Sequence, residues 1–176
     1  MLLLVSGCHS GNLINQDSQS LSSDRKQSDP NFPEKEGEII TYTSASDLIS
    51  VPDSIIYYHQ GKQTIINNDN NKFNTIITMT KNRAFIVKGI FKTLVTKTDI
   101  ETLKQNNFVL EFLYSKNIAV NWKNPVDSDN VSNYEYNVIL FPLNGEWNKF
   151  MIFSPKSSGP LGSMGSADEL LKYLNQ

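Results

Sequence analysis

The stretch Tyr134-Glu-Tyr-Asn-Val-Ile-Leu-Phe-Pro-Leu143, then Asn144-Gly145, then Glu146-Trp-Asn-Lys-Phe-Met-Ile-Phe153 decides the fold. Two runs rich in β-branched and aromatic residues flank Asn-Gly, the pair most typical of a two-residue hairpin with a type I′ turn. The pattern predicts a hairpin in which Leu143 pairs with Glu146. The missing N–H of Pro142 then points away from the partner strand, so we expect a sheet edge there.

More strands are predicted on the N-terminal side of this hairpin. Residues 108–114 alternate clearly, with one strongly apolar face and a second face that carries Glu111, and residues 117–122 form another strand. The polar run 123–133 is a loop. Earlier in the chain, the predicted strands are 38–43, a hairpin of 54–59 and 62–67 that turns at Gln60-Gly61, and a long strand over 84–95.

Three helices are predicted. Asn68 or Asp69 caps a helix that runs to about residue 82, because residues 73, 76, 77 and 80 share one face. Thr98 and Glu101 form the capping box of a short helix that ends near residue 106. Ser166 and Glu169 form a second capping box, which opens a C-terminal helix with a leucine stripe.

The fold class is therefore α+β. We expect a single domain over residues 38–176, with a largely antiparallel sheet of about eight strands and about three helices on one face. Residues 9–37 are rich in Ser, Asn, Gln and Asp and have no sustained apolar period. They form a disordered tether in this interpretation, because they bury too little surface to offset the entropy of ordering.

Composition excludes several classes of function. The single cysteine, Cys8, excludes an internal disulfide framework and a cysteine-rich zinc site. The chain has 18 acidic and 16 basic residues, and the tether holds five and three of them, which leaves 13 of each in the domain. Nucleic-acid binding needs a concentrated positive field, so no nucleic-acid partner is expected.

The start of the chain reads Leu4-Val5-Ser6-Gly7-Cys8. This motif resembles the lipobox of bacterial surface lipoproteins, and the overall layout of lipobox, tether and strand-rich domain resembles small uncharacterised lipoproteins of low-GC Gram-positive bacteria. The resemblance implies cleavage after residues 1–7, lipidation of Cys8, and a domain carried by the segment 8–37 at the outer face of the cell membrane. A stable anchor of this kind needs two acyl chains and no membrane-spanning helix. The apolar run before Cys8 is shorter than a signal peptide requires, so we expect that further residues precede it.

The sharpest candidate for a ligand site is the glycine-rich loop over residues 157–166. A strand, a glycine-rich loop and a helix in this order can present N–H groups to an anion, and the candidate residues are Gly159, Gly162, Gly165 and Ser166. The spacing is neither that of a P-loop nor that of a dinucleotide fingerprint. The alternative is that the glycines steer the chain from the sheet into the last helix.

Aromatic residues offer a second candidate surface, for a glycan or a peptide: Tyr57, Tyr58, Trp122 and Trp147. The two adjacent tyrosines face opposite sides of a strand, so one of them can be exposed. For tryptophan in a domain of this size, a place in the core is the more frequent alternative.

No catalytic residue, metal site or cofactor is predicted. The run from Asp127 to Asn130 begins like a calcium loop but lacks the later ligands. His59 is the only histidine in the predicted domain and has no zinc-ligand set near it. Paired carboxylates remain open for Glu111 and Glu135, with an outward-facing or hydrogen-bonded carboxylate as the alternative.

Two hypotheses of different class follow. The first is a non-enzymatic surface lipoprotein whose domain binds a protein, peptide or glycan of the envelope. The second is an exported hydrolase with a carboxylate or serine site, and a purely structural envelope protein is a third possibility. An exposed aromatic sheet favours binding, whereas a cleft that holds Glu111, Glu135 or His59 with a shifted pKa favours an enzyme. The oligomeric state is left open.

Overall fold

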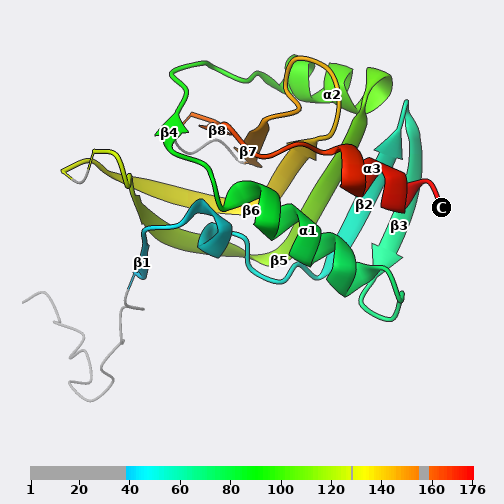
Figure 1. Ribbon diagram of the computed structural model, residues 1–176, viewed down its shortest axis with the longest axis horizontal. Coiled ribbons are helices and arrows are strands. Elements are labelled where there is room, and N and C mark those ends of the chain that lie inside the picture. Colours follow the sequence, from blue (N-terminus) through cyan, green and yellow to red (C-terminus); the bar gives the residue numbers. More distant parts are fainter. Residues whose placement is uncertain (1–38, 128, 155–158) are drawn as a thin grey trace, which may run out of the picture. The chain divides into compact units, whose positions relative to one another are not determined.

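The computed structural model describes residues 39–127, 129–154 and 159–176, which belong to one compact unit (Figure 1). Cys8 and the segment 9–37 lie outside the described residues. The elements in chain order are β1 (Thr41–Tyr42), the 3-10 helix η1 (Ala45–Leu48), β2 (Ser54–His59), β3 (Lys62–Asn67), α1 (Phe73–Ala84), β4 (Gly89–Ile90), α2 (Lys97–Asn106), β5 (Phe108–Lys123), β6 (Val131–Pro142), β7 (Phe150–Ser154), β8 (Leu161–Gly162) and α3 (Asp168–Leu174).

The eight strands form one sheet in the order β3-β2-β5-β6-β7-β8-β4, and β1 pairs with the far half of β5. Every pairing is antiparallel except that of β1 with β5. The predicted class, a single α+β domain with a largely antiparallel sheet, is confirmed. The two predicted strands over 108–114 and 117–122 are one long strand, β5, whose pairing with β6 shifts between Leu113 and Ile118.

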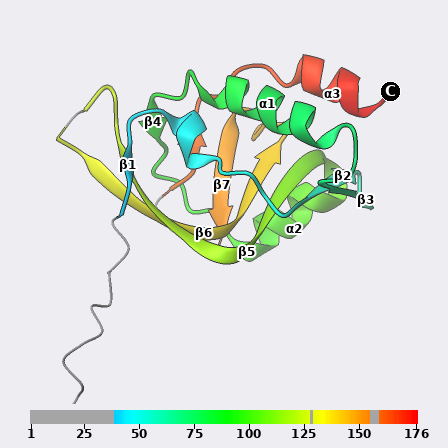
Figure 2. The same cartoon turned by 90° about the horizontal axis from the view of Figure 1, so that it is seen from below.

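Helices cover both faces of the sheet, not one face as the sequence suggested (Figure 2). Helices α1 and α3 pack with η1 on the face that holds the main core. Helix α2 packs on the opposite face, where Leu103 meets a smaller cluster that includes Val109, Leu140 and Ile152. The prediction of one covered face was wrong because α2 is mostly polar, and only the tertiary structure shows that its few apolar side chains close over the second face.

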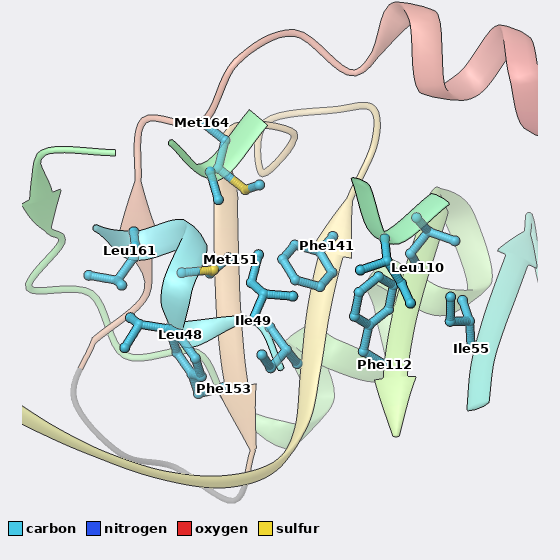
Figure 3. Packing of buried hydrophobic residues seen from close by; sticks show 14 of the residues in the cluster. Leu48, Ile49, Ile55, Leu110, Phe112, Phe141, Met151, Phe153, Leu161 and Met164 are labelled. Carbon is cyan, nitrogen blue, oxygen red and sulfur yellow. The ribbon is translucent and has the colours of Figure 1, made fainter. Parts of the chain in front are cut away.

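The main core lies on the sheet face that α1 and η1 cover, and Figure 3 shows some of its side chains, among them Leu48 of η1 and Phe112, Phe141 and Met151 of the sheet. Phe112 of β5 and Phe141 of β6 pack edge to face at 4.9 Å between ring centroids. The predicted apolar face of residues 108–114 is confirmed, and so is the buried face of α1, whose members are fully or almost fully buried: Phe73, Ile76, Ile77 and Thr80. Each large side chain buried here stabilises the fold by about 1.5–3 kcal/mol.

The hairpin of β2 and β3 has the predicted strands and turn. His59 pairs with Lys62, and Gln60 and Gly61 both have positive φ, at 50° and 84°, as a type I′ turn requires. A glycine at position 61 adopts this backbone conformation without a steric cost.

The hairpin predicted over residues 134–153 exists, but its predicted register was wrong. Ile139 pairs with Phe153, and the turn is a longer loop over residues 143–149. The backbone N–H of Leu143 donates to Phe108 O on β5, and the side chain of Asn144 accepts from Phe108 N. These bonds keep the chain beside β5 past Pro142, so it turns toward β7 later than an isolated hairpin would.

Several element boundaries also differ from the prediction. The predicted strand over 84–95 is only β4, because α1 continues to Ala84 and a loop follows Ile90. Helix α1 begins at Phe73 without a side-chain cap, and residues 68–72, which include the predicted caps Asn68 and Asp69, form a turn before it. The capping box of α2 is formed by Thr96 and Asp99, two residues before the predicted pair.

Two more boundaries were corrected at the ends of predicted elements. The first strand is the short β1, which pairs with β5. The Ser166 hydroxyl accepts from Asp168 N at the start of α3, without the reciprocal bond from Glu169 that a capping box needs. The leucine stripe of α3 is confirmed, with Leu170 buried and Leu171 and Leu174 packed against the main core.

Candidate functional site

A cavity of about 400 Å³ lies between α2 and the sheet face that α2 covers, and we call it the α2 cavity. Its apolar wall comes from the sheet and from Val95, and its polar wall comes from α2 and Glu111. The residues that line it are Thr93, Val95, Lys97, Ile100, Glu101, Lys104, Glu111, Val138, Leu140, Ile152, Phe153, Ser154, Gly159 and Pro160. Its volume is within the range of small-molecule sites.

Glu111 anchors the polar side of the α2 cavity. Its side chain is about 8% exposed, and its two carboxylate oxygens have different partners. The Tyr58 hydroxyl donates to Oε2 at 2.6 Å, and the Lys104 ammonium group donates to Oε1 at 2.5 Å. A buried carboxylate is stable only when it is paired and hydrogen-bonded in this way. This outcome is the hydrogen-bonded alternative that the sequence left open.

Tyr58 and Lys104 also contact each other. The Lys104 ammonium group lies 5.0 Å from the centroid of the Tyr58 ring, within the range of a cation–π interaction. Burial raises the pKa of the Tyr58 hydroxyl, and its bond to Glu111 raises that pKa further. The hydroxyl therefore stays protonated and donates to Glu111 throughout the neutral range.

The geometry and docking of α2 position the polar side chains that line the α2 cavity. Residues 97, 101 and 104 of α2 are four and three positions apart, so their side chains share one face of the helix. The end of α2 is tied to the β2–β3 turn, because Gly61 N donates to Lys104 O and Gln60 N donates to Asn107 O. This docking holds Lys104 over β2 and β5, which carry Tyr58 and Glu111.

The predicted aromatic surface does not form as a group. Tyr57 and Tyr58 face opposite sides of β2 as expected, but both are buried, because helices cover both sheet faces. Trp122 is fully buried in the main core, and only Trp147 is partly exposed. Three of the four candidates are therefore core residues.

The described part of the glycine-rich loop has internal contacts. Gly165 N donates to Arg83 O, and the Arg83 guanidinium donates to the carbonyl oxygens of Gly165 and Ser166. A Cβ atom on Gly159 would lie 2.1 Å from Phe91 O, and Gly162 pairs with β4 and β7. These contacts favour the structural alternative, and residues 157–158 lie outside the described ranges.

The other catalytic candidates do not come together. Glu111 pairs with Leu140, and Glu135 is five residues earlier on β6, about 16 Å away along the strand. Glycosidase carboxylates are about 5–9.5 Å apart, so this pair does not fit that role. His59 is exposed on β2 and does not line the α2 cavity. The described residues contain no group of three metal-ligating side chains.

Sequence reasoning found Glu111 but not its partners or the cavity. One signal for the partners was available. A strand that is apolar on both faces is buried on both, so a carboxylate on it needs a counter-charge nearby. Lys104 is seven residues away in the chain, and Tyr58 is on a different strand. The pairing of β2 with β5 brings Tyr58 beside Glu111, and the docking of α2 adds Lys104.

Comparison of the chain with protein-family models, with curated proteins and with solved structures finds no match. In the described part of the chain, no helix is both long and apolar enough to cross a membrane.

Proposed function

We propose that this protein is a lipid-anchored component of the bacterial cell envelope and that its domain is a non-enzymatic binding module. The ligand occupies the α2 cavity. The binding role rests on a cavity with an apolar sheet wall opposite a charge-compensated Lys104–Glu111 pair, and the anchor rests on the motif from Leu4 to Cys8. Apolar walls with a few fixed polar groups are typical of binding sites for small amphipathic groups.

The polar side of the α2 cavity indicates what the ligand carries. Glu111 has a partner on each oxygen, whereas the Lys104 ammonium group has further N–H bonds to donate. A ligand that fits therefore has an oxygen acceptor near Lys104 and an apolar part against Val138, Leu140 and Ile152. Such a group can be free or can belong to an envelope peptide, glycan or protein.

A hydrolase is the weaker candidate, although Glu111 does lie in a cleft. A serine or threonine nucleophile needs a base within hydrogen-bond reach. Among the described residues, the hydroxyl groups that line the α2 cavity are those of Thr93 and Ser154, and neither has a hydrogen bond to a carboxylate or lysine. The only buried carboxylate in the described ranges is Glu111, which is already paired with Lys104.

Filling the α2 cavity is expected to abolish binding of an amphipathic probe. Val138 is half-buried and lines the cavity, so Val138→Trp should occupy its volume. We expect 1-anilinonaphthalene-8-sulfonate, which has apolar rings and an oxygen acceptor, to bind at least about tenfold more weakly to this variant in a fluorescence titration. Val131→Trp is the matched control, because Val131 is exposed on the same strand and does not line the cavity. Equal binding by both variants would locate the probe elsewhere.

Lipidation of Cys8 is expected when the natural gene is expressed in a bacterium that processes lipoproteins. The mature chain should begin at Cys8, carry a diacylglyceryl mass in an intact-mass measurement, and sediment with membranes. Cys8→Ala should lose both the added mass and the membrane association. A wild-type chain that keeps residues 1–7 and stays in the soluble fraction would contradict the anchor and leave the binding proposal in place.

A further inference from the structure

A second, smaller cavity of about 210 Å³ has three aromatic walls, and we call it the aromatic cleft. Its lining residues are Phe91, Thr93, Glu146, Trp147 and Phe150. The Phe91 and Phe150 rings are 4.7 Å apart between centroids at 85°, and the Trp147 and Phe150 rings are 5.3 Å apart at 60°. Phe150 is thus in edge-to-face contact with Phe91 and is steeply inclined to Trp147, so the three rings form one contiguous aromatic wall.

The strand pairing around β8 positions these rings. Gly162 of β8 pairs with Gly89 on one side and with Phe150 on the other. Phe91 N donates to Pro160 O, which holds the residue after β4 beside the same strand. A Cβ atom at Gly162 would lie 2.9 Å from both the Phe91 and Phe150 rings. The absence of a side chain there therefore lets the two rings meet above the strand.

The cleft rings are accessible, unlike the aromatic residues of the core. Phe91 is 40% exposed, and Trp147 and Phe150 are partly exposed. Glu146 is exposed and, among the residues that the structure describes, is the only ionisable one that lines the cleft. Within the described residues it has no ion-pair partner, and neighbouring Lys92 and Lys149 are not among the lining residues.

We propose that the aromatic cleft binds an organic cation, specifically an alkylated ammonium group. Aromatic faces carry negative electrostatic potential and attract cations most strongly when the cation is poorly hydrated, as an alkylated ammonium is. The partly exposed rings of the cleft provide such a surface, and Glu146 supplies the counter-charge at the rim. The volume of the cleft suits a headgroup of the size of choline.

This site does not depend on the function proposed for the α2 cavity or on the lipid anchor. Thr93 lines both the cleft and the cavity, so the two sites adjoin. Their chemistry is different, because the α2 cavity offers ammonium donors to an oxygen acceptor and the cleft offers rings and a carboxylate to a cation.

Choline and its neutral isostere 3,3-dimethylbutan-1-ol test the proposal directly, because they differ only in the charged nitrogen. Both are titrated into the full chain, with tryptophan fluorescence as the readout and calorimetry for affinity. Trp122 is fully buried, so the fluorescence change should come from Trp147. We expect choline to bind about tenfold or more tightly than the isostere. Equal affinities, or no saturable binding of choline, would overturn the proposal.

Two variants identify the site. Glu146→Gln removes the counter-charge and Phe91→Leu removes one ring, and both residues are exposed enough for the fold to survive. Each should weaken choline binding several-fold, and Glu146→Gln should leave binding of the neutral isostere unchanged. The controls are Glu169→Gln and Phe85→Leu, since both residues are exposed and neither lines the cleft. Choline binding that survives both cleft variants would refute the site.

Discussion

Replacing Lys104 with methionine is expected to lower the free energy of unfolding by about 3 kcal/mol. The methionine keeps most of the apolar contacts of the lysine stem on α2 but removes the ammonium group from Glu111. The carboxylate is then left in a nearly buried place, and Tyr58 is its one remaining hydrogen-bond partner among the described residues. The loss of a buried counter-charge costs more than the pair itself contributes, because the remaining charge cannot regain its hydration.

Urea denaturation followed by circular dichroism measures this change, and a double variant tests its cause. Glu111→Gln removes the charge but keeps an acceptor for the Tyr58 hydroxyl, so Lys104→Met combined with Glu111→Gln should recover most of the lost stability. Lys97→Met is the matched control, since Lys97 also lines the α2 cavity but has no ion pair among the described residues. A Lys104→Met variant within about 0.5 kcal/mol of the wild type would show that the pair is not buried in solution.

The second large effect is expected for Arg83→Met, also with a loss of about 3 kcal/mol or more. The Arg83 side chain is 6% exposed, and its guanidinium donates to three backbone carbonyls, those of Asn148, Gly165 and Ser166. Burial lowers the pKa of Arg83 to about 10, and nearby Asp168 acts in the opposite direction. The group therefore remains charged at neutral pH, and each of its hydrogen bonds is charge-assisted.

We also predict which part of the structure loses stability in Arg83→Met. Arg83 lies in the last turn of α1 and contacts the segment that leads into α3, so hydrogen exchange should increase most in the amides of α3. Arg83→Lys should recover little stability, because an ammonium group does not reproduce the planar fork that reaches three carbonyls. Lys88→Met removes an equal charge from an exposed position and should change little. Protection of α3 that is unchanged in Arg83→Met would contradict this role.

The fold was predictable from the sequence where the residues of one short stretch determine a helix, strand or turn by themselves. Gln60-Gly61 closes the β2–β3 hairpin because a type I′ turn needs two residues with positive φ. The alternation in residues 108–114 predicted a buried strand, and the spacing of the apolar residues in α1 predicted its core face. In each case the neighbours in sequence are also the neighbours that matter in space.

The failures occurred where a distant contact competes with a local preference. Asn144-Gly145 favours a tight turn, but Leu143 and Asn144 bond to Phe108 of β5, and the chain turns later. The run 84–95 has strand propensity, but α1 extends to Ala84, and only Gly89–Ile90 finds a strand to pair with. Strand propensity depends strongly on such pairing and on burial.

For the candidate sites, too, some features follow from the sequence and others from distant contacts. Sequence alone determined the α+β class, the apolar strand faces, the near-neutral charge of the domain and the presence of a carboxylate on a buried strand. Tertiary structure decided that α2 covers the second sheet face, that Lys104 and Tyr58 meet Glu111, and that Phe91 and Phe150 meet above Gly162. The physical reason is that periodicity records which side of an element is apolar, whereas a cavity depends on which elements those sides face.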